Sequence, residues 1–491
     1  MEFRRYTIEE TRAYEKKASE AIGEKDRPAF HLTPLVGWMN DPNGFSVYQG
    51  KTHLFYQYYP YDTCWGPMHW GHAVSEDLIR WEFLPAALSP DSDPDAIGCF
   101  SGTAMETEEG HVLLYTGVSK VPNGDGTETE LQNQCLAVGD GVNYSKYENN
   151  PVVRGEDLPD GFNRTDFRDP KFWKEGDHYC MIAGNRDENR FGQILLFTST
   201  DLRNWKYETV LAHNDGRYGG MWECPDFFAL GDKHVLITSP QDMRADRYEF
   251  HNGNNAIYFT GDYDAEKHVY SYGDARALDY GFDFYAPETL LLPDGRRVMV
   301  GWMQSWDNNF LPQGRKWNGM MTIPRELTLK NGRIWQIPIR EIENYRTGKT
   351  VYTDVTVAGD CELEGIRGRY LDMTVTVKGG SYDSFTVEIA CDEENTTVFT
   401  YDPARNMMEA DRTYSGLIRD VLCQRKMRVA DRNGEIKLRF ILDRNSAELF
   451  VNDGEQVFSM AMVTPLQSEG IRFSAQGTAV IDVEKYELVM K

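Results

Sequence analysis

The sequence has few of the features that mark nucleic-acid-binding, membrane or exported proteins. Positive charge is scarce, with 52 Lys and Arg against 77 Asp and Glu, and the net charge of −25 opposes binding to nucleic acid or to an anionic membrane. No run approaches the roughly 18 apolar residues of a membrane span. The first 30 residues contain no apolar segment typical of a signal peptide. We therefore expect no nucleic-acid or membrane partner.

Cysteines are also few, and their spacing in the sequence indicates no pairs. The eight cysteines are scattered along the chain and form no C-x-x-C pair. Without a signal segment, reduced thiols are a better interpretation than disulfides. The sequence therefore predicts a cytoplasmic protein.

A repeat organises the first two-thirds of the chain. Five times, a glycine-containing turn is followed at once by a short run rich in β-branched or aromatic residues, as in a β-hairpin. The intervals between the turn glycines are 60, 66, 55 and 64 residues. The five turn glycines are Gly50, Gly110, Gly176, Gly231 and Gly295.

A unit of this length, holding about four short strands, is typical of a propeller blade. A near-identical phrase recurs in two units, as Ser75-Glu-Asp-Leu-Ile-Arg-Trp81 and Ser199-Thr-Asp-Leu-Arg-Asn-Trp205. A large sandwich is the rival architecture, but it leaves the even spacing of the hairpins unexplained. We predict a five-bladed β-propeller over residues 31–335, preceded by an N-terminal extension, 1–30, with a solvated helix over 7–22.

The pattern changes near residue 350 to longer runs in which polar and apolar residues alternate, such as YLDMTVTV and EIKLRFIL. Such strands are half buried against a second sheet. We predict a C-terminal β-sandwich over 351–491, joined to the propeller by a polar linker, 336–350, that includes a short helix. The fold class is therefore all-β, a propeller followed by a sandwich.

A polar cluster precedes each turn glycine. Each cluster alone resembles an ordinary turn, but all five occupy the same place in the repeat, and equivalent strands of a propeller approach one axis. We therefore expect them to converge on one funnel that contains Asp41, Asp169, Glu223 and Arg168. The clusters are Asn40–Gly44, Phe100–Gly102, Arg168–Pro170, Glu223–Asp226 and Tyr285–Glu288.

Carboxylates without a nucleotide loop or a nucleophile–base pair favour glycoside chemistry, which needs one carboxylate as nucleophile and one as proton donor. Residues 38–83 hold 12 aromatics in 46 positions. Such a density is expected either of a wall on which sugars stack or of packing within a blade. His69 and His72 lack the further ligands of a metal site. We expect a small carbohydrate substrate, and neither a metal nor a cofactor.

The motifs resemble those of glycoside hydrolase family 32, which includes invertases, sucrose-6-phosphate hydrolases and fructan hydrolases. The resemblance extends from about residue 31 through the sandwich and implies the same propeller-plus-sandwich fold. The segments that carry it include Trp38-Met39-Asn40-Asp41-Pro42-Asn43-Gly44, Arg168-Asp169-Pro170, Glu223-Cys224-Pro225, Trp65–His72, Asp279–Tyr285, Gly301-Trp302-Met303 and Asp443–Glu448.

By this resemblance Asp41 is the nucleophile, Glu223 the acid/base and Asp169 the stabiliser of the transition state. The implied activity is that of a retaining β-fructofuranosidase acting on sucrose and short fructo-oligosaccharides. Cys224 and Asp226 neighbour Glu223, so tuning of its pKa is a hypothesis. The residues implied to bind fructose are Asn40, Gln57, Trp65, Phe100, Ser101, Arg168 and Trp302.

Three alternatives stay open. A sucrose-6-phosphate hydrolase would need cations near the leaving group, for which the loop residues Arg186, Arg190 and Arg244 are candidates. A non-catalytic carbohydrate-binding propeller could share this fold, although a binder needs no nucleophile and acid together. A retaining enzyme can also transfer its fructosyl group to a sugar instead of water. The sequence leaves the oligomeric state undetermined.

Overall fold

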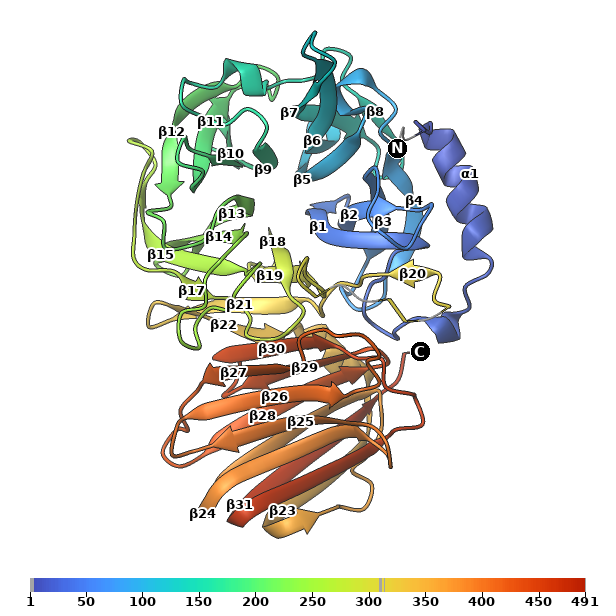
Figure 1. Cartoon of the computed structure of the whole chain (residues 1–491), viewed down its shortest axis with the longest axis vertical. Helices are drawn as coiled ribbons and strands as arrows, with labels where there is room; N and C mark the ends of the chain where they lie inside the picture. Colours follow the sequence, from blue (N-terminus) through green and yellow to red (C-terminus); the bar gives the residue numbers. More distant parts are fainter. Residues whose placement is uncertain (1–3, 309–310, 313, 491) are drawn as a thin grey trace.

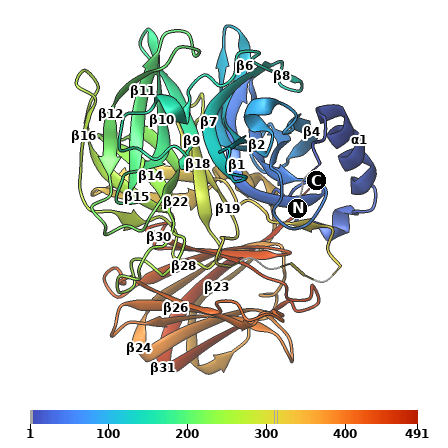
Figure 2. The same cartoon turned by 45° about the horizontal axis from the view of Figure 1, so that its top comes forward.

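The structure is a computed structural model that describes residues 4–308, 311–312 and 314–490. The propeller and the sandwich predicted from the sequence are both present (Figure 1). Five sheets surround a central axis, and the strands nearest that axis are β1, β5, β9, β13 and β18. The sandwich lies against the edge of the propeller beside β21 and β22 (Figures 1 and 2). The fold is therefore a five-bladed β-propeller followed by a C-terminal β-sandwich.

Each blade is an antiparallel sheet whose strands follow one another in the chain. Blade 1 holds β1 (Gly37–Tyr48), β2 (Lys51–Tyr59), β3 (His69–Ser75) and β4 (Glu82–Leu88). Blade 2 holds β5 (Gly98–Thr107), β6 (Gly110–Pro122), β7 (Glu128–Gly139) and β8 (Tyr144–Lys146). Blade 3 holds β9 (Phe167–Glu175), β10 (His178–Arg186), β11 (Gly192–Ser199) and β12 (Lys206–His213).

Blades 4 and 5 complete the ring. Blade 4 holds β13 (Trp222–Leu230), β14 (Lys233–Pro240), β15 (Ile257–Asp264), β16 (Val269–Tyr272) and the short β17 (Arg276–Ala277). Blade 5 holds β18 (Tyr285–Leu291), β19 (Arg297–Trp302), β21 (Arg325–Lys330) and β22 (Arg333–Pro338). β20 (Trp317–Asn318) leaves blade 5 and pairs in parallel with β1. This pairing ties the last blade to the first.

The five turn glycines lie in the first hairpin of their blades, as the repeat predicted. Their φ angles are 78°, 125°, 60°, 63° and 89° in chain order. This left-handed region carries a steric penalty for residues with a Cβ but not for glycine. The spacing of the glycines therefore follows the spacing of the blades.

The sandwich is built from strands that pass through both of its layers. The first part of β24 pairs with β28, its last part pairs with β25, and β31 follows it along almost its whole length. Two hydrogen-bonded layers thus enclose one apolar core. The strands are β23 (Arg346–Cys361), β24 (Leu371–Cys391), β25 (Thr396–Asp402), β26 (Met407–Tyr414), β27 (Gln424–Arg428), β28 (Ile436–Asp443), β29 (Ser446–Val451), β30 (Gln456–Ala461) and β31 (Gly470–Leu488).

The segment between the two parts is shorter than the predicted linker, 336–350. β22 continues to Pro338 because it pairs with β21, and β23 begins at Arg346 because it pairs with β31. The short 3₁₀ helix η4 (Arg340–Tyr345) fills the space between them. The other 3₁₀ helices are η1 (Glu24–Asp26), η2 (Asp93–Asp95) and η3 (Gly155–Asp157).

A buried ion network joins the propeller to the sandwich. Arg325 is fully buried and donates to Asp279 at 2.9 Å and to Glu448 at 3.2 Å. His31 contacts Glu448 at 3.0 Å and Asp443 at 2.8 Å. Burial lowers the pKa of His31, but its hydrogen bonds to the two carboxylates raise it to about 9. The imidazole is therefore charged at neutral pH, so that two buried cations face the three buried carboxylates of the network.

The N-terminal helix α1 (Ile8–Ser19) lies within the predicted 7–22 segment and packs beside β4 (Figure 1). The helix was predicted as a solvated surface element, and one side of it is buried at Thr11 and Glu15. Glu15 accepts a hydrogen bond from the Ala86 backbone at 2.8 Å. Among the described residues, none of the helices has the length and apolar character needed to cross a bilayer.

Candidate active site

The five predicted polar clusters lie on the five inner strands, and each contains a β-bulge. In a regular strand, neighbouring side chains point to opposite faces, whereas a bulge redirects one of them. Asp169, Cys224 and Ala286 stand at equivalent places in three bulges and have φ angles of 63°, 46° and 49°. Such strained backbone is concentrated at functional sites.

Four consecutive motif positions can be followed through the blades. Positions 1 and 2 mostly face a cavity of about 910 Å³, whereas positions 3 and 4 mostly line a separate cavity of about 20 Å³ further along the strands. Position 1 is Asn40, Phe100, Arg168, Glu223 or Tyr285, and position 2 is Asp41, Ser101, Asp169, Cys224 or Ala286. Position 3 is Pro42, Gly102, Pro170, Pro225 or Pro287, and position 4 is Asn43, Thr103, Lys171, Asp226 or Glu288.

Asp41 lines the larger cavity and is surrounded by donors. Asn40 donates to its Oδ1 at 3.0 Å, and Ser101 donates to its Oδ2 at 2.8 Å. The Cys224 thiol lies 3.4 Å from the same Oδ2. Burial and the charge of Glu223 raise the pKa of Asp41, and the three donors counteract this rise.

Asp169 is joined to the same group through Cys224. The Cys224 backbone N–H donates to Asp169 Oδ2 at 2.9 Å, and the thiol lies 3.7 Å from that oxygen. Burial raises the pKa of Asp169 to about 7, while the nearby Arg168 charge lowers it. Cys224 therefore links Asp41 and Asp169 through its backbone N–H and its thiol, and its hypothesised influence on Glu223 stays a prediction.

Glu223 is held on both of its oxygens. Arg168 donates to Oε1 through Nε at 3.1 Å and through Nη2 at 2.9 Å. The Tyr285 hydroxyl lies 2.6 Å from Oε2 and 2.9 Å from the Ser239 carbonyl. Charge-assisted contacts of this kind fix the orientation of a carboxylate.

The structure brings most of the predicted binding residues together. Asn40, Gln57, Trp65, Phe100, Ser101 and Arg168 all line the larger cavity. Trp65 is 46% exposed and lies 6.2 Å from Phe100 between ring centroids.

Two predicted positions lie elsewhere. Trp302 is fully buried outside the cavity lining, because its ring packs against Trp38 and Trp306 with centroids 5.9 and 5.0 Å away. Asp226 occupies position 4, where it accepts from the Thr289 N–H at 2.6 Å and lies 3.5 Å from Lys171. The bulge separates Asp226 from Glu223, so its predicted tuning role loses its geometric basis.

Sequence reasoning missed several residues of the site. Tyr285 could have been found, because it stands at the same motif position as Glu223. Asp166 binds Arg168 at 2.7 Å and is only two residues from a recognised motif. The lining also includes Trp306 and Asn254 from connecting segments and Gln132 from β7. These residues have no fixed position in the repeat, so no sequence signal marked them.

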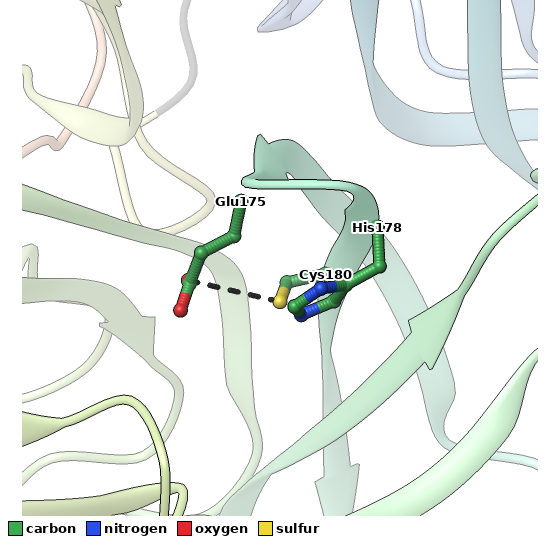
Figure 3. A group of neighbouring side chains, drawn as sticks. All are labelled: Glu175, His178 and Cys180. Atoms are coloured by element: carbon green, nitrogen blue, oxygen red, sulfur yellow. Dashed lines mark hydrogen bonds between the residues drawn. The ribbon is translucent and has the colours of Figure 1, made fainter.

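A mixed cluster outside the cavity is the one group of described residues whose spacing suits a metal. Glu175, His178 and Cys180 have ligand atoms within 4.8 Å of one another, since they share one face of the β9–β10 hairpin (Figure 3). The Cys180 thiol donates to Glu175 at 3.8 Å, and burial raises its pKa to about 12. We interpret the cluster as a hydrogen-bonded part of the hairpin.

The two histidines of the HWGH segment have separate partners. His69 contacts the Pro67 carbonyl at 2.8 Å, and His72 contacts His53 at 2.9 Å. Burial lowers the pKa of both imidazoles, that of His69 to about 3. They belong to the packed interior of blade 1.

The cavity thus combines the buried carboxylates of Asp41 and Asp169 and the partly buried carboxylate of Glu223 with an arginine, amide and hydroxyl donors and aromatic side chains. One carboxylate can attack a carbon centre while another exchanges a proton with an oxygen, as glycoside hydrolysis requires. The aromatic and polar lining suits a sugar. Fold and site together define a glycoside hydrolase.

Comparison with known proteins identifies the family. Residues 31–338 match the glycosyl hydrolases family 32 N-terminal domain, and residues 341–489 match the glycosyl hydrolases family 32 C-terminal domain. The chain belongs to glycoside hydrolase family 32.

The relatives span nearly the whole chain. A sucrose-6-phosphate hydrolase of Escherichia coli is 34% identical over 478 residues, which is 95% of each chain. A raffinose invertase of Escherichia coli is 35% identical over 471 residues, covering 95% of this chain and 96% of the relative. A mutant family 32 β-fructofuranosidase of Bombyx mori, solved with sucrose, is 36% identical with a TM-score of 0.85 and 98% coverage of both chains.

Proposed function

We propose that this chain is a retaining β-fructofuranosidase that hydrolyses terminal, non-reducing β-D-fructofuranosyl residues of sucrose and short fructo-oligosaccharides. The names of its relatives and the polar, sugar-sized cavity support this activity. The observation that carries the proposal is that Asp41 and Glu223 face one cavity, with Asp169 bonded beside them through Cys224.

In the first step, an Asp41 oxygen attacks the anomeric carbon of the fructosyl unit. Glu223 gives a proton to the glycosidic oxygen, so that the leaving sugar departs as a neutral alcohol and a fructosyl ester forms on Asp41. Ser101 and Asn40 hold the attacking carboxylate in place through their hydrogen bonds. This orientation lowers the entropic cost of reaching the transition state.

In the second step, Glu223 acts as a base. It takes a proton from water, whose oxygen attacks the anomeric carbon and releases the Asp41 carboxylate. Asp169 stabilises the positive charge that develops on the sugar in both steps and binds its hydroxyl groups. Asn40, Gln57, Trp65, Phe100, Ser101 and Arg168 complete the fructosyl subsite.

The test is sugar release from sucrose and kestose by the wild-type protein and by Asp41→Ala and Glu223→Gln variants. We expect kcat to fall by at least about 1,000-fold in each, because each removes a group that acts directly on the reacting atoms. Asp62→Asn, which changes an exposed carboxylate outside the cavity, is the matched control. Sugar binding without release above the Asp41→Ala background would make the protein a carbohydrate-binding propeller.

The second candidate is a sucrose-6-phosphate hydrolase, which the name of the Escherichia coli relative favours. It uses the same two chemical steps, so the triad variants do not distinguish it. The two candidate functions are distinguished by the kcat/KM values for the neutral and the phosphorylated sugar.

We also propose that the protein acts in the cytoplasm. All eight cysteines are free thiols, the state maintained in a reducing compartment. Fractionation of the native host with an antibody to the protein tests this location, and recovery from the extracellular fraction would contradict it.

A further inference from the structure

The larger cavity is strongly acidic. Three carboxylates belong to the proposed catalytic triad, and Asp166 is bound to Arg168. The remaining three, Glu128, Glu130 and Asp242, form an outer group that the chemistry of the triad does not require. The seven carboxylates that line the cavity are Asp41, Glu128, Glu130, Asp166, Asp169, Glu223 and Asp242.

Arg168 is the single basic residue among the described residues that line the cavity. Its guanidinium binds Glu223 through Nε and Nη2, and its Nη1 donates to Asp166 at 2.7 Å and to Gln132 at 3.2 Å. These contacts occupy four of the five N–H groups that a guanidinium offers. Arg168 is thus committed to carboxylates and has little capacity left for an anionic substrate.

The loop arginines that the sequence offered for phosphate binding lie outside the lining. Arg186 is bound to Asp166 through Nε at 2.8 Å. Arg190 and Arg244 are exposed in loops and do not line the cavity. Lys120 lies near the rim, 3.7 Å from Glu128, but it is 47% exposed, and such a pair contributes little in solvent.

Two of the outer carboxylates, Glu128 and Glu130, lie on β7 next to Gln132, which is connected to Glu223 through Arg168. Glu128, Glu130 and Gln132 alternate along β7, so their side chains share one face. Gln132 accepts from Arg168 and donates to Glu130 at 3.2 Å. Asp242 follows β14 in blade 4 and reaches the cavity from another blade. Negative charge therefore extends outward from Glu223.

We infer that Glu128, Glu130 and Asp242 select neutral leaving groups and exclude phosphorylated ones. The inference rests on the proposed function, and it specifies the substrate class of that same site. A phosphate ester carries a charge of about −1.5 to −2 at pH 7. Bringing it beside three further carboxylates, of which Glu128 and Asp242 are exposed and Glu130 is partly buried, is repulsive at low ionic strength, and repulsion of the wrong ligand is an effective source of specificity.

The experiment compares kcat/KM for sucrose and sucrose 6-phosphate at low ionic strength. EDTA is present, because a divalent cation would bridge the phosphate to the carboxylates. We expect the wild-type protein to prefer sucrose by at least about 100-fold, and added salt to narrow this ratio through screening. In the triple variant Glu128→Gln/Glu130→Gln/Asp242→Asn the preference should fall by about 10-fold or more, and Glu130→Lys should lower it further.

The control is Glu108→Gln/Glu266→Gln/Glu393→Gln, which changes the net charge equally at exposed positions outside the cavity. Its sucrose preference should equal that of the wild type. Equal or faster turnover of sucrose 6-phosphate by the wild type would overturn the inference while leaving the glycosidase intact. An unchanged preference in the triple variant would also overturn it, whereas failure to hydrolyse either sugar would contradict the proposed function itself.

Discussion

Tyr285 and Glu223 stand at the same motif position in neighbouring blades, and their side chains meet at 2.6 Å between Oη and Oε2. The Tyr285 hydroxyl also lies 2.9 Å from the Ser239 carbonyl, which can only accept. When Tyr285 donates to Ser239, its oxygen can accept the proton of a neutral Glu223. When Glu223 is ionised, the hydroxyl can donate to it instead. Tyr285 is therefore suited to hold the proposed acid/base in both of its protonation states.

Replacing Tyr285 by Phe should lower kcat by about 10-fold, because a hydrogen bond to a charged group is worth roughly 1.5 to 3 kcal/mol and part of that is lost. The pH profile of kcat/KM should change on its alkaline limb, where a general acid loses its proton. Tyr270→Phe is the matched control, since that buried hydroxyl donates to the backbone carbonyls of His234 and Phe259 in blade 4. An unchanged kcat and pH profile in Tyr285→Phe would remove its positioning role.

Cys224→Ala should shift the acid limb of the kcat/KM profile to higher pH by a few tenths of a unit to about one unit. The thiol is a weak donor to Asp41 and Asp169, and burial raises its pKa well above the ordinary range, so it stays protonated. Loss of the donor raises the pKa of the buried Asp41 carboxyl further. Cys224→Ser retains a donor and should keep the wild-type limb; coincident profiles for all three proteins would contradict this account.

Lys171→Met should destabilise the propeller by about 3 to 5 kcal/mol, the usual cost of leaving buried charges without their partner. Lys171 lies 3.2 Å from Glu288 and 3.5 Å from Asp226, and both carboxylates are almost fully buried. Adding Asp226→Asn and Glu288→Gln to the variant should restore much of the loss. Thermal unfolding provides the measurement, with the exposed Lys174→Met as control; similar melting temperatures for Lys171→Met and Lys174→Met would refute the prediction.

The docking of α1 should weaken as the pH rises. Burial raises the pKa of Glu15 to about 7, so the folded state favours its protonated form. The resulting stabilisation is fully present below the ordinary pKa near 4.5 and is lost as the pH rises through 7. Its size is on the order of 3 kcal/mol.

Hydrogen exchange of residues 8–19 in the wild type and in Glu15→Gln, compared at equal pH, measures this effect. The wild type should lose protection relative to Glu15→Gln between pH 5 and pH 8. The exposed Glu20→Gln variant should follow the wild type at both values. A constant difference between wild type and Glu15→Gln would show that the carboxyl does not control docking.

The sequence by itself determined the architecture. Turn glycines need positive φ, and short apolar strands need partners, so their regular spacing predicted both the five blades and the convergence of five polar clusters. The change to long alternating strands predicted the sandwich. These features are local and periodic, so they can be recognised from the sequence alone.

Only the tertiary structure decided which side chains meet. The bulges turn motif positions 1 and 2 into the larger cavity and place Asp226 elsewhere, while the packing of three tryptophans keeps Trp302 out of the lining. The acidic row on β7 and Asp242 come from different blades, and nothing in their spacing indicates a common cavity. Register, bulges and the closure of the ring bring distant residues together, and these depend on pairing across the whole propeller rather than on any local run.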